Sequence, residues 1–222
     1  MESGARVHVK GLVKPVIIAL NAPLARRRLR RELAQATPPL RIELGGIAPR
    51  PGWVVTNANW NTRLFLDATQ PWPVAPGSVE LIFADNMVEH LTLDQARAFL
   101  RQAHTALRPG GTIRLPTPDV ESAARYYLGE DEARAAAVLG MHRQKGHVAE
   151  HSTDLLRVPF ADHGHHVGYL YDETSLSAEL KRAGFHSIRR CATGESDNPA
   201  LRGLENRTDE EALVQLILEA DA

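Results

Sequence analysis

The stretch from residue 79 to residue 115 limits the possible fold more than any other part of the chain. Residues 79–84, VELIFA, are typical of a buried strand. Apolar side chains then recur with helical spacing from Thr92 to about Leu107, and Arg108-Pro109-Gly110-Gly111 ends that helix before another strand at 112–115. Two strands joined by a helix run parallel in one sheet, so this stretch predicts an α/β fold.

Further elements are predicted on both sides of this unit. The strands are expected at 40–44, 53–57 and 185–191, and the helices at 23–36, 119–128, 130–143 and 172–183. Only eight residues, 45–52, separate the first two strands, which is too few for a full crossover helix. Residues 142–168 are expected to form a long polar loop. Residues 212–219 fit either a helix behind a Thr208–Glu211 capping box or a buried strand.

Charge and composition exclude several classes of protein. The chain has 222 residues, one cysteine and a net charge of −1, which fits one domain in a reducing compartment and argues against a nucleic-acid coat protein. No apolar run reaches the 18 residues of a membrane span, and a cytoplasmic location is expected. Residues 1–50 hold ten basic and three acidic side chains, whereas residues 195–222 hold two and eight. The arginines at 26–31 are either a solvated helix face or a patch for an anion.

Four segments in a fixed order resemble a known family. They are IELGG (42–46) with PGW (51–53), LDATQPWPVAPGSVELIFADNMVEHL (66–91), LRPGG (107–111), and HHVGYLYDETSL with AGF within 165–185. The set resembles the class I S-adenosylmethionine-dependent methyltransferases, and most of all the small family found in bacterial sugar and natural-product gene clusters. The resemblance implies a Rossmann-like, mostly parallel, seven-stranded sheet with an antiparallel C-terminal strand and helices on both faces.

The resemblance also implies a division of the chain. Residues 1–36 are expected to form a basic N-terminal arm or helix, and residues 37–222 the methyltransferase domain. Within that domain, residues 116–168 are expected to be a helical and histidine-rich insertion on the substrate side. The final antiparallel strand is expected near 212–219.

Cofactor binding is expected along the carboxyl ends of the strands, where open α/β sheets bind ligands. The resemblance assigns it to Glu43, Gly45, Gly46, Asn57, Asp67, Asp85 and Asn86. A glycine turn lets backbone N–H groups approach the methionine part of S-adenosylmethionine, and Asp67 matches the position that meets the adenine amino group. Two residues depart from the family pattern: Ile47 replaces a second glycine, and Asn57 replaces the ribose-binding aspartate.

Histidines are concentrated near the predicted insertion. Six of the ten lie between residues 142 and 166, and His163, His165 and His166 are the densest group. Methylation of a hydroxyl requires loss of its proton, and a neutral imidazole can take that proton near pH 7. These three histidines are therefore the expected catalytic residues.

A metal site is considered and not expected. His147 and His151 have the spacing that places both imidazoles on one helical face. Glu89 and His90 match part of the Glu-x-x-Glu-His metal motif of ubiquinone and small-RNA O-methyltransferases, but Asn86 stands in the place of the first glutamate. The prediction is a methyltransferase without a metal.

The resemblance implies transfer of a methyl group from S-adenosylmethionine to a hydroxyl of a sugar or natural product. The alternative is a catalytically degenerate scaffold or partner subunit, with Ile47 and Asn57 marking a lost cofactor site. A third possibility keeps the fold and uses His or Asp groups for elimination or cyclisation. An NAD-linked dehydrogenase is disfavoured because the first turn lacks G-x-G-x-x-G. A small-molecule acceptor and a possible homo-oligomer are the expected partners, not a membrane or a nucleic acid.

Overall fold

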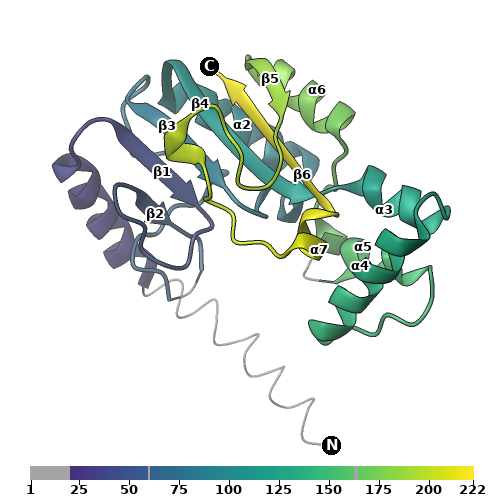
Figure 1. The fold of residues 1–222 in the computed structure, drawn as a ribbon. Helices are drawn as coiled ribbons and strands as arrows, with labels where there is room; N and C mark the ends of the chain where they lie inside the picture. Colours follow the sequence, from purple (N-terminus) through teal and green to yellow (C-terminus); the bar gives the residue numbers. More distant parts are fainter. Residues whose placement is uncertain (1–20, 60, 163–164) are drawn as a thin grey trace, which may run out of the picture.

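The computed structural model describes residues 21–59, 61–162 and 165–222 (Figure 1). The strands are β1 (Leu40–Leu44), β2 (Val54–Thr56), β3 (Val79–Ala84), β4 (Leu107–Pro118), β5 (His186–Arg190) and β6 (Gln215–Asp221). The helices are α2 (Leu93–Ala106), α3 (Val120–Tyr127), α4 (Glu132–Gln144), α5 (Asp154–Ala161), α6 (Glu173–Ala183) and α7 (Asp209–Ala212). Three short 3-10 helices are η1 (Val88–His90), η2 (His165–Val167) and η3 (Pro199–Leu201).

The strands form one mixed sheet in the order β2-β1-β3-β4-β6-β5. The first four are parallel, and β6 runs antiparallel to β4 and β5, which confirms the expected α/β class and the antiparallel C-terminal strand. The expected count of seven is wrong, because the described residues form six strands. Between β2 and β3, the described residues do not form another strand. Phe65 makes only a single parallel bridge with Asn57, and a turn from Asp67 to Gln70 follows.

The central strand–helix–strand unit follows its prediction closely. Strand β3 covers 79–84, and α2 begins after a capping box between Thr92 and Gln95. The expected turn at Pro109-Gly110-Gly111 lies inside β4 instead of ahead of it. It forms a bulge, since Val79 pairs with Leu107 while Leu81 pairs with Thr112.

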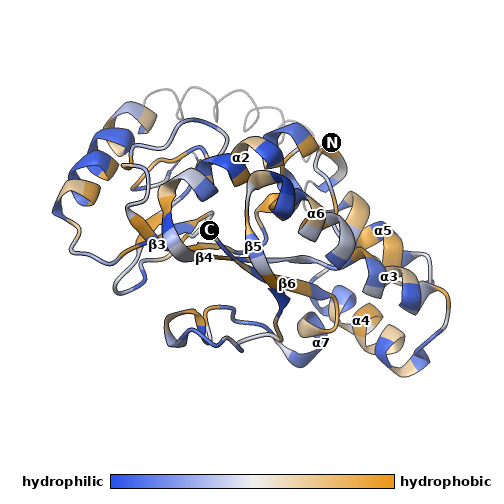
Figure 2. Cartoon of the chain, turned by 90° about the horizontal axis from the view of Figure 1, so that it is seen from above, coloured by the Kyte–Doolittle hydropathy of each residue, from blue (hydrophilic) through white to orange (hydrophobic). Residues whose placement is uncertain are grey.

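One face of the sheet is apolar and carries the helices. Ile42, Ile82, Ile113 and Leu218 belong to the main core cluster, together with apolar residues of α2 and α6. Leu29, from the helical residues 21–35, also belongs to this cluster. The expectation of helices on both faces is wrong for the centre of the sheet. Figure 2 shows α2 and α6 on one face and an extended segment on the other.

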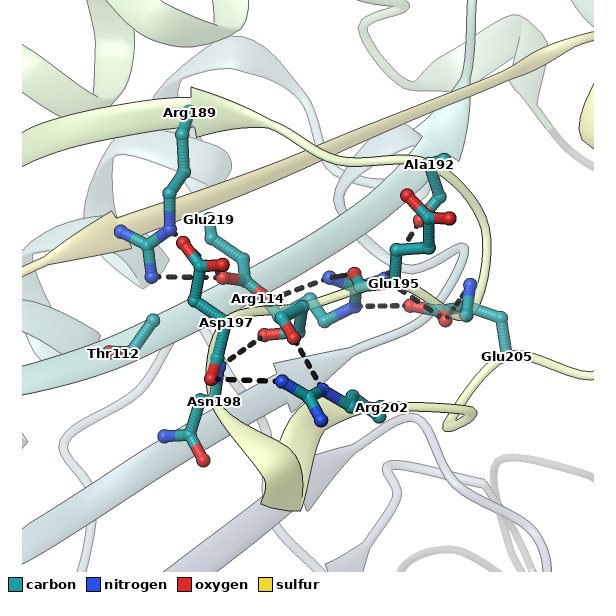
Figure 3. A network of polar contacts seen from close by, with 12 residues as sticks. Thr112, Arg114, Arg189, Ala192, Glu195, Asp197, Asn198, Arg202, Glu205 and Glu219 are labelled. Carbon is teal, nitrogen blue, oxygen red and sulfur yellow. Dashed lines mark hydrogen bonds and ion pairs between the residues drawn. The ribbon is translucent and has the colours of Figure 1, made fainter.

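That segment, residues 191–208, is named the cover segment. It lies over polar side chains of the sheet, with Arg114 at the centre (Figure 3). Arg114 is completely buried and donates to Glu219 Oε1 at 2.6 Å and to Glu205 Oε2 at 3.1 Å. Its Nη1 also donates to the carbonyl oxygen of Glu195 at 2.9 Å. A helix with an apolar stripe could not satisfy this guanidinium, whereas an irregular segment offers it carbonyl and carboxylate oxygens.

A helical lobe, residues 120–167, lies beyond the carboxyl end of β4 (Figure 1). Helices α3 and α4 confirm two predictions, but the expected loop at 142–168 is wrong because it contains α5. The carboxylate of Asp154 accepts hydrogen bonds from the backbone N–H groups of Glu150 and His151, which holds the start of α5. Residues 147–151 are not helical, so His147 and His151 do not share a helix face.

The ends of the chain settle two further expectations. Both predictions for residues 212–219 hold in part, because Thr208 and Glu211 cap the short α7 and β6 follows it. Of the predicted N-terminal arm, residues 1–20 lie outside the described residues, and residues 21–35 are helical. No helix within the described ranges is both long and apolar enough to cross a membrane.

Candidate functional site

The carboxyl ends of β2, β1 and β3 meet at one edge of the sheet and bring several predicted residues together. The Gly45-Gly46 turn follows β1, Asn57 follows β2, and Asp85 with Asn86 follows β3. Parallel strands with register Ile42–Val54 and Ile42–Ile82 force these ends to the same edge. The topology therefore brings these predicted residues to one edge of the sheet.

The turn after β1 is built around two glycines. Gly45 has a φ of +78°, a conformation that favours glycine. A Cβ on Gly46 would lie 2.4 Å from Val55 Cγ1 and 2.6 Å from Glu43 Oε1, so a larger residue does not fit there. Glu43 is buried, and its Oε2 accepts from Arg50 Nε at 2.6 Å. Ile47 is 92% exposed, which explains why this turn does not need the family's next glycine.

Asn57 stabilises this turn with its own amide group. Its Nδ2 donates to the carbonyl oxygens of Gly45 at 2.8 Å and Gly46 at 3.2 Å. Its Oδ1 accepts from the backbone N–H of Asn59 at 2.9 Å. The side chain is thus used as a donor to the protein, whereas a ribose-binding aspartate would act as an acceptor for the ligand.

Replacing Asn57 by aspartate is expected to lower the affinity for S-adenosylhomocysteine instead of restoring a family-like site. The substitution removes two hydrogen bonds and places a carboxylate beside two carbonyl oxygens. We expect a loss of about tenfold in Kd, which calorimetric titration would measure. Asn206→Asp, at an exposed position that does not line the cavity beside Asn57, is the control. Tighter binding by the Asn57 variant would contradict this role.

The remaining predicted cofactor residues differ in their surroundings. Asp67 Oδ1 accepts from the N–H of Thr69 at 3.0 Å and from its hydroxyl at 2.7 Å, so this carboxylate caps a turn. Asp85 pairs with Arg207 of the cover segment, while burial raises the pKa of Asp85 above its ordinary value. Asn86 has a φ of +44°, and its Oδ1 is buried with no hydrogen-bond partner in the part of the chain that the structure describes.

A cavity of about 280 Å³ lies between this edge and the helical lobe. Asn86 and Arg207 line it on the sheet side, and His142 and Lys145 line it on the lobe side. His165 also lines the cavity and is almost fully buried. The structure therefore has a cavity lined by histidines between the sheet edge and the helical lobe.

Of the three expected catalytic histidines, the structure describes the side chain of His165 alone. His165 Nδ1 lies 2.7 Å from the carbonyl oxygen of Pro159, and because that oxygen can only accept, Nδ1 carries the proton. His163 and the side chain of His166 lie outside the described residues. The sequence analysis missed His90 and His142 as cavity residues. The position of His90 in the segment that follows β3 was the available signal, but His90 was considered only for metal binding.

Glu89 is the most unusual ionisable group beside the cavity. Its side chain is fully buried, and its Oε2 accepts from Thr117 Oγ1 at 3.1 Å. Its Oε1 has no hydrogen-bond partner among the described residues. Burial raises the pKa of Glu89 to about 8, against the opposing effect of its hydrogen bonds. The rings of His90 and His165 lie beside it, with centroids 4.8 Å apart.

Comparison with known families shows which family the chain belongs to. A family model described as a methyltransferase domain matches residues 26–189. The chain belongs to this methyltransferase family. The match confirms the expected enzyme class, a transferase, and the expected cofactor, S-adenosylmethionine. Among curated proteins no sequence match was found.

Solved structures similar to the methyltransferase are distant in sequence. An S-adenosylmethionine-dependent methyltransferase from Archaeoglobus fulgidus is 12% identical, with a TM-score of 0.47 and coverage of 90% of this chain and 94% of that one. The CurJ carbon methyltransferase is 14% identical, with a TM-score of 0.47 over 86% of this chain and 50% of its own. The phosphoethanolamine N-methyltransferase 2 of Haemonchus contortus is 14% identical, with a TM-score of 0.46 over 90% of this chain and 52% of its own. The methyltransferase thus spans about half the length of two of these proteins, and similarity at this level assigns no residue role.

The edge of the sheet offers groups that fit S-adenosylmethionine. A second cavity, of about 680 Å³, lies beside Gly46, Ile47 and Asn57, within the range of about 300–1,000 Å³ usual for ligand pockets. The buried Oδ1 of Asn86 is an acceptor that a ligand N–H group can satisfy. The Gly45-Gly46 turn would hold the methionine part by its backbone. Asn57 lines this cavity, and its amide group is hydrogen-bonded to the turn.

Proposed function

We propose that this methyltransferase acts on a hydroxyl of a small sugar or natural-product acceptor bound in the 280 Å³ cavity. The observation that carries the proposal is a buried imidazole, that of His165, held at the cavity wall by the carbonyl oxygen of Pro159. The volume lies just below the range of about 300–1,000 Å³ usual for ligand pockets, which favours an acceptor of one or two rings. The single cysteine fits a cytoplasmic enzyme.

The protein's own groups can hold the acceptor and take its proton. With Nδ1 protonated, Nε2 of His165 carries the lone pair that can accept the hydroxyl proton. Lys145 and Arg207 line the cavity and can donate hydrogen bonds to other oxygens of the acceptor. When bound, S-adenosylmethionine supplies the electrophilic methyl group. Positioning of the acceptor against it supplies much of the remaining acceleration.

Replacing His165 by glutamine is expected to lower kcat by about 10²- to 10⁴-fold, because an amide cannot act as the general base. Purified protein is incubated with methyl-labelled S-adenosylmethionine and a panel of monosaccharides and hydroxylated aromatic compounds. Mass spectrometry then locates the transferred methyl group. His186→Gln, at an exposed position on β5, is the matched control and should keep full activity.

Three results would contradict the proposal. One is transfer only to nitrogen or carbon, and another is an unchanged kcat in the His165 variant. The third is no binding of S-adenosylmethionine at millimolar concentration, which would favour the scaffold instead. Binding of S-adenosylhomocysteine by the His165 variant with wild-type affinity would show that the cofactor edge is intact.

A further inference from the structure

Three side chains that can bind a metal meet at the wall of the cavity. A carboxylate oxygen of Glu89 and one ring nitrogen each of His90 and His165 lie within 4.8 Å of one another. Glu89 and His90 are adjacent on η1, and His165 lies on η2, far away along the chain. We propose that these three residues bind a divalent first-row metal ion such as Zn²⁺ or Mn²⁺.

The environment of Glu89 is the first argument. Removing a carboxyl group from water is costly unless hydrogen bonds or a cation compensate it. Thr117 serves one oxygen of Glu89, and the other has no hydrogen-bond partner within the described ranges. A carboxylate oxygen of Glu89 also lies in the cluster with the two imidazoles. A bound cation would satisfy it, whereas the proposed methyl transfer gives it no role.

The orientation of His165 is the second argument. Histidines that bind metals usually donate their other ring N–H to a carbonyl or carboxylate, which orients the ring and selects the tautomer. The Nδ1 of His165 makes such a contact with the carbonyl oxygen of Pro159 at 2.7 Å. The remaining nitrogen, Nε2, is then the atom that can bind an ion.

The packing of η2 on η1 is the third argument. Gly168 follows η2, and a Cβ at this position would lie 1.7 Å from the carbonyl oxygen of Glu89. Only a glycine therefore lets the turn that carries His165 lie directly on the backbone of Glu89. The chain uses a residue without a side chain at the contact that brings the three ligands together.

The ligand set predicts the type of ion and site. Two imidazoles and one carboxylate suit zinc, iron or manganese better than calcium or magnesium. Bonds of about 2.0–2.2 Å require donor atoms roughly 3–3.5 Å apart around an ion, so small side-chain rotations would close the cluster. Because His90 is exposed and lines the cavity with His165, further coordination positions would face the cavity. Three protein ligands with an open position are the pattern of catalytic metal sites.

This proposal goes beyond the proposed acceptor and reaction, and it shares one atom with them. A bound ion would take the same Nε2 of His165 that serves as the base in the metal-free protein. Metal binding without methyl transfer would therefore contradict only the proposed function. Methyl transfer by protein that binds no metal would contradict only the metal site.

The experiment measures metal binding directly, without an activity assay. Full-length protein is freed of metal with a chelator and titrated with Zn²⁺ by calorimetry, and with Co²⁺ by visible absorption. We expect one ion per chain with micromolar or tighter Kd, and Co²⁺ bands typical of nitrogen and oxygen ligands. His90→Gln should weaken binding at least tenfold, and Glu89→Gln should do the same.

The control variant is His151→Gln, an exposed histidine of the helical lobe outside the cluster, which should bind like the wild type. Because His90 is exposed, its variant tests the site even if the buried Glu89 variant fails to fold. Absence of one-to-one binding by the wild type would overturn the proposal. Equal binding by wild type and the His90 variant would also overturn it, since the ion would then lie elsewhere.

Discussion

Replacing Arg114 by leucine is expected to lower the free energy of unfolding by about 3–5 kcal/mol. The side chains of Arg114, Glu205 and Glu219 are all 0% exposed. Without the guanidinium, Glu205 has no cationic partner among the described residues, whereas Glu219 retains Arg189 Nη2 at 2.9 Å. Urea denaturation at neutral pH, followed by circular dichroism, would measure the loss.

Exposed ion pairs of the same chemistry provide the control. Arg125 Nε contacts Glu130 Oε2 at 2.7 Å, and the two side chains are 59% and 49% exposed. Arg125→Leu should leave the free energy of unfolding nearly unchanged, because water solvates both charges in either state. If both variants lost the same small amount, the buried network would not be what holds the cover segment on the sheet.

Replacing Gly168 by alanine is expected to cost about 3 kcal/mol in the free energy of unfolding, at the upper end of overpacking effects. The new Cβ would lie 1.7 Å from the carbonyl oxygen of Glu89 and 2.7 Å from its carbonyl carbon. These are backbone atoms, so the clash cannot be relieved by rotating a side chain. The η2 turn must move off η1 and carry His165 out of the cavity wall. Thermal unfolding and Zn²⁺ titration together would measure both effects.

A glycine in an open position shows what the same substitution does without a clash. A Cβ on Gly140, within α4, would have only Arg143 Nη2 nearby, at 3.9 Å. Gly140→Ala should stabilise the protein by up to about 1 kcal/mol through helix propensity. A Gly168 variant as stable as the Gly140 variant would show that η1 and η2 are not in tight contact.

The parts of the fold that depend on local interactions could be predicted from the sequence. Strands β1 and β3 occupy the predicted ranges 40–44 and 79–84, because each is an apolar run bounded by turn residues. The start of α2 was predicted from Thr92, whose capping box lies within four residues of sequence. Helix α5 was missed because Pro159 and the polar residues before it are typical of a loop.

The site depends on contacts that no local pattern encodes. The glycine turn was predicted, but the use of Asn57 as a donor to that turn requires knowledge of where the two loops lie. Arg207 could not be placed beside Asp85 from sequence, because the two residues are separated by 122 positions. The same is true of His165 and Glu89, which the packing of Gly168 brings together.

The cover segment has a consequence for how the protein forms during its synthesis. Residues of the first half, such as Arg50 and Asp85, are bonded to Leu204 and Arg207 across sequence separations of 154 and 122. A growing chain on the ribosome would hold β1, β3 and β4 with one polar face bare until these late residues emerge. Such long-range closure slows folding, and until it occurs Arg114 and Glu43 remain in water. The cover segment is thus made after the half of the sheet that it completes.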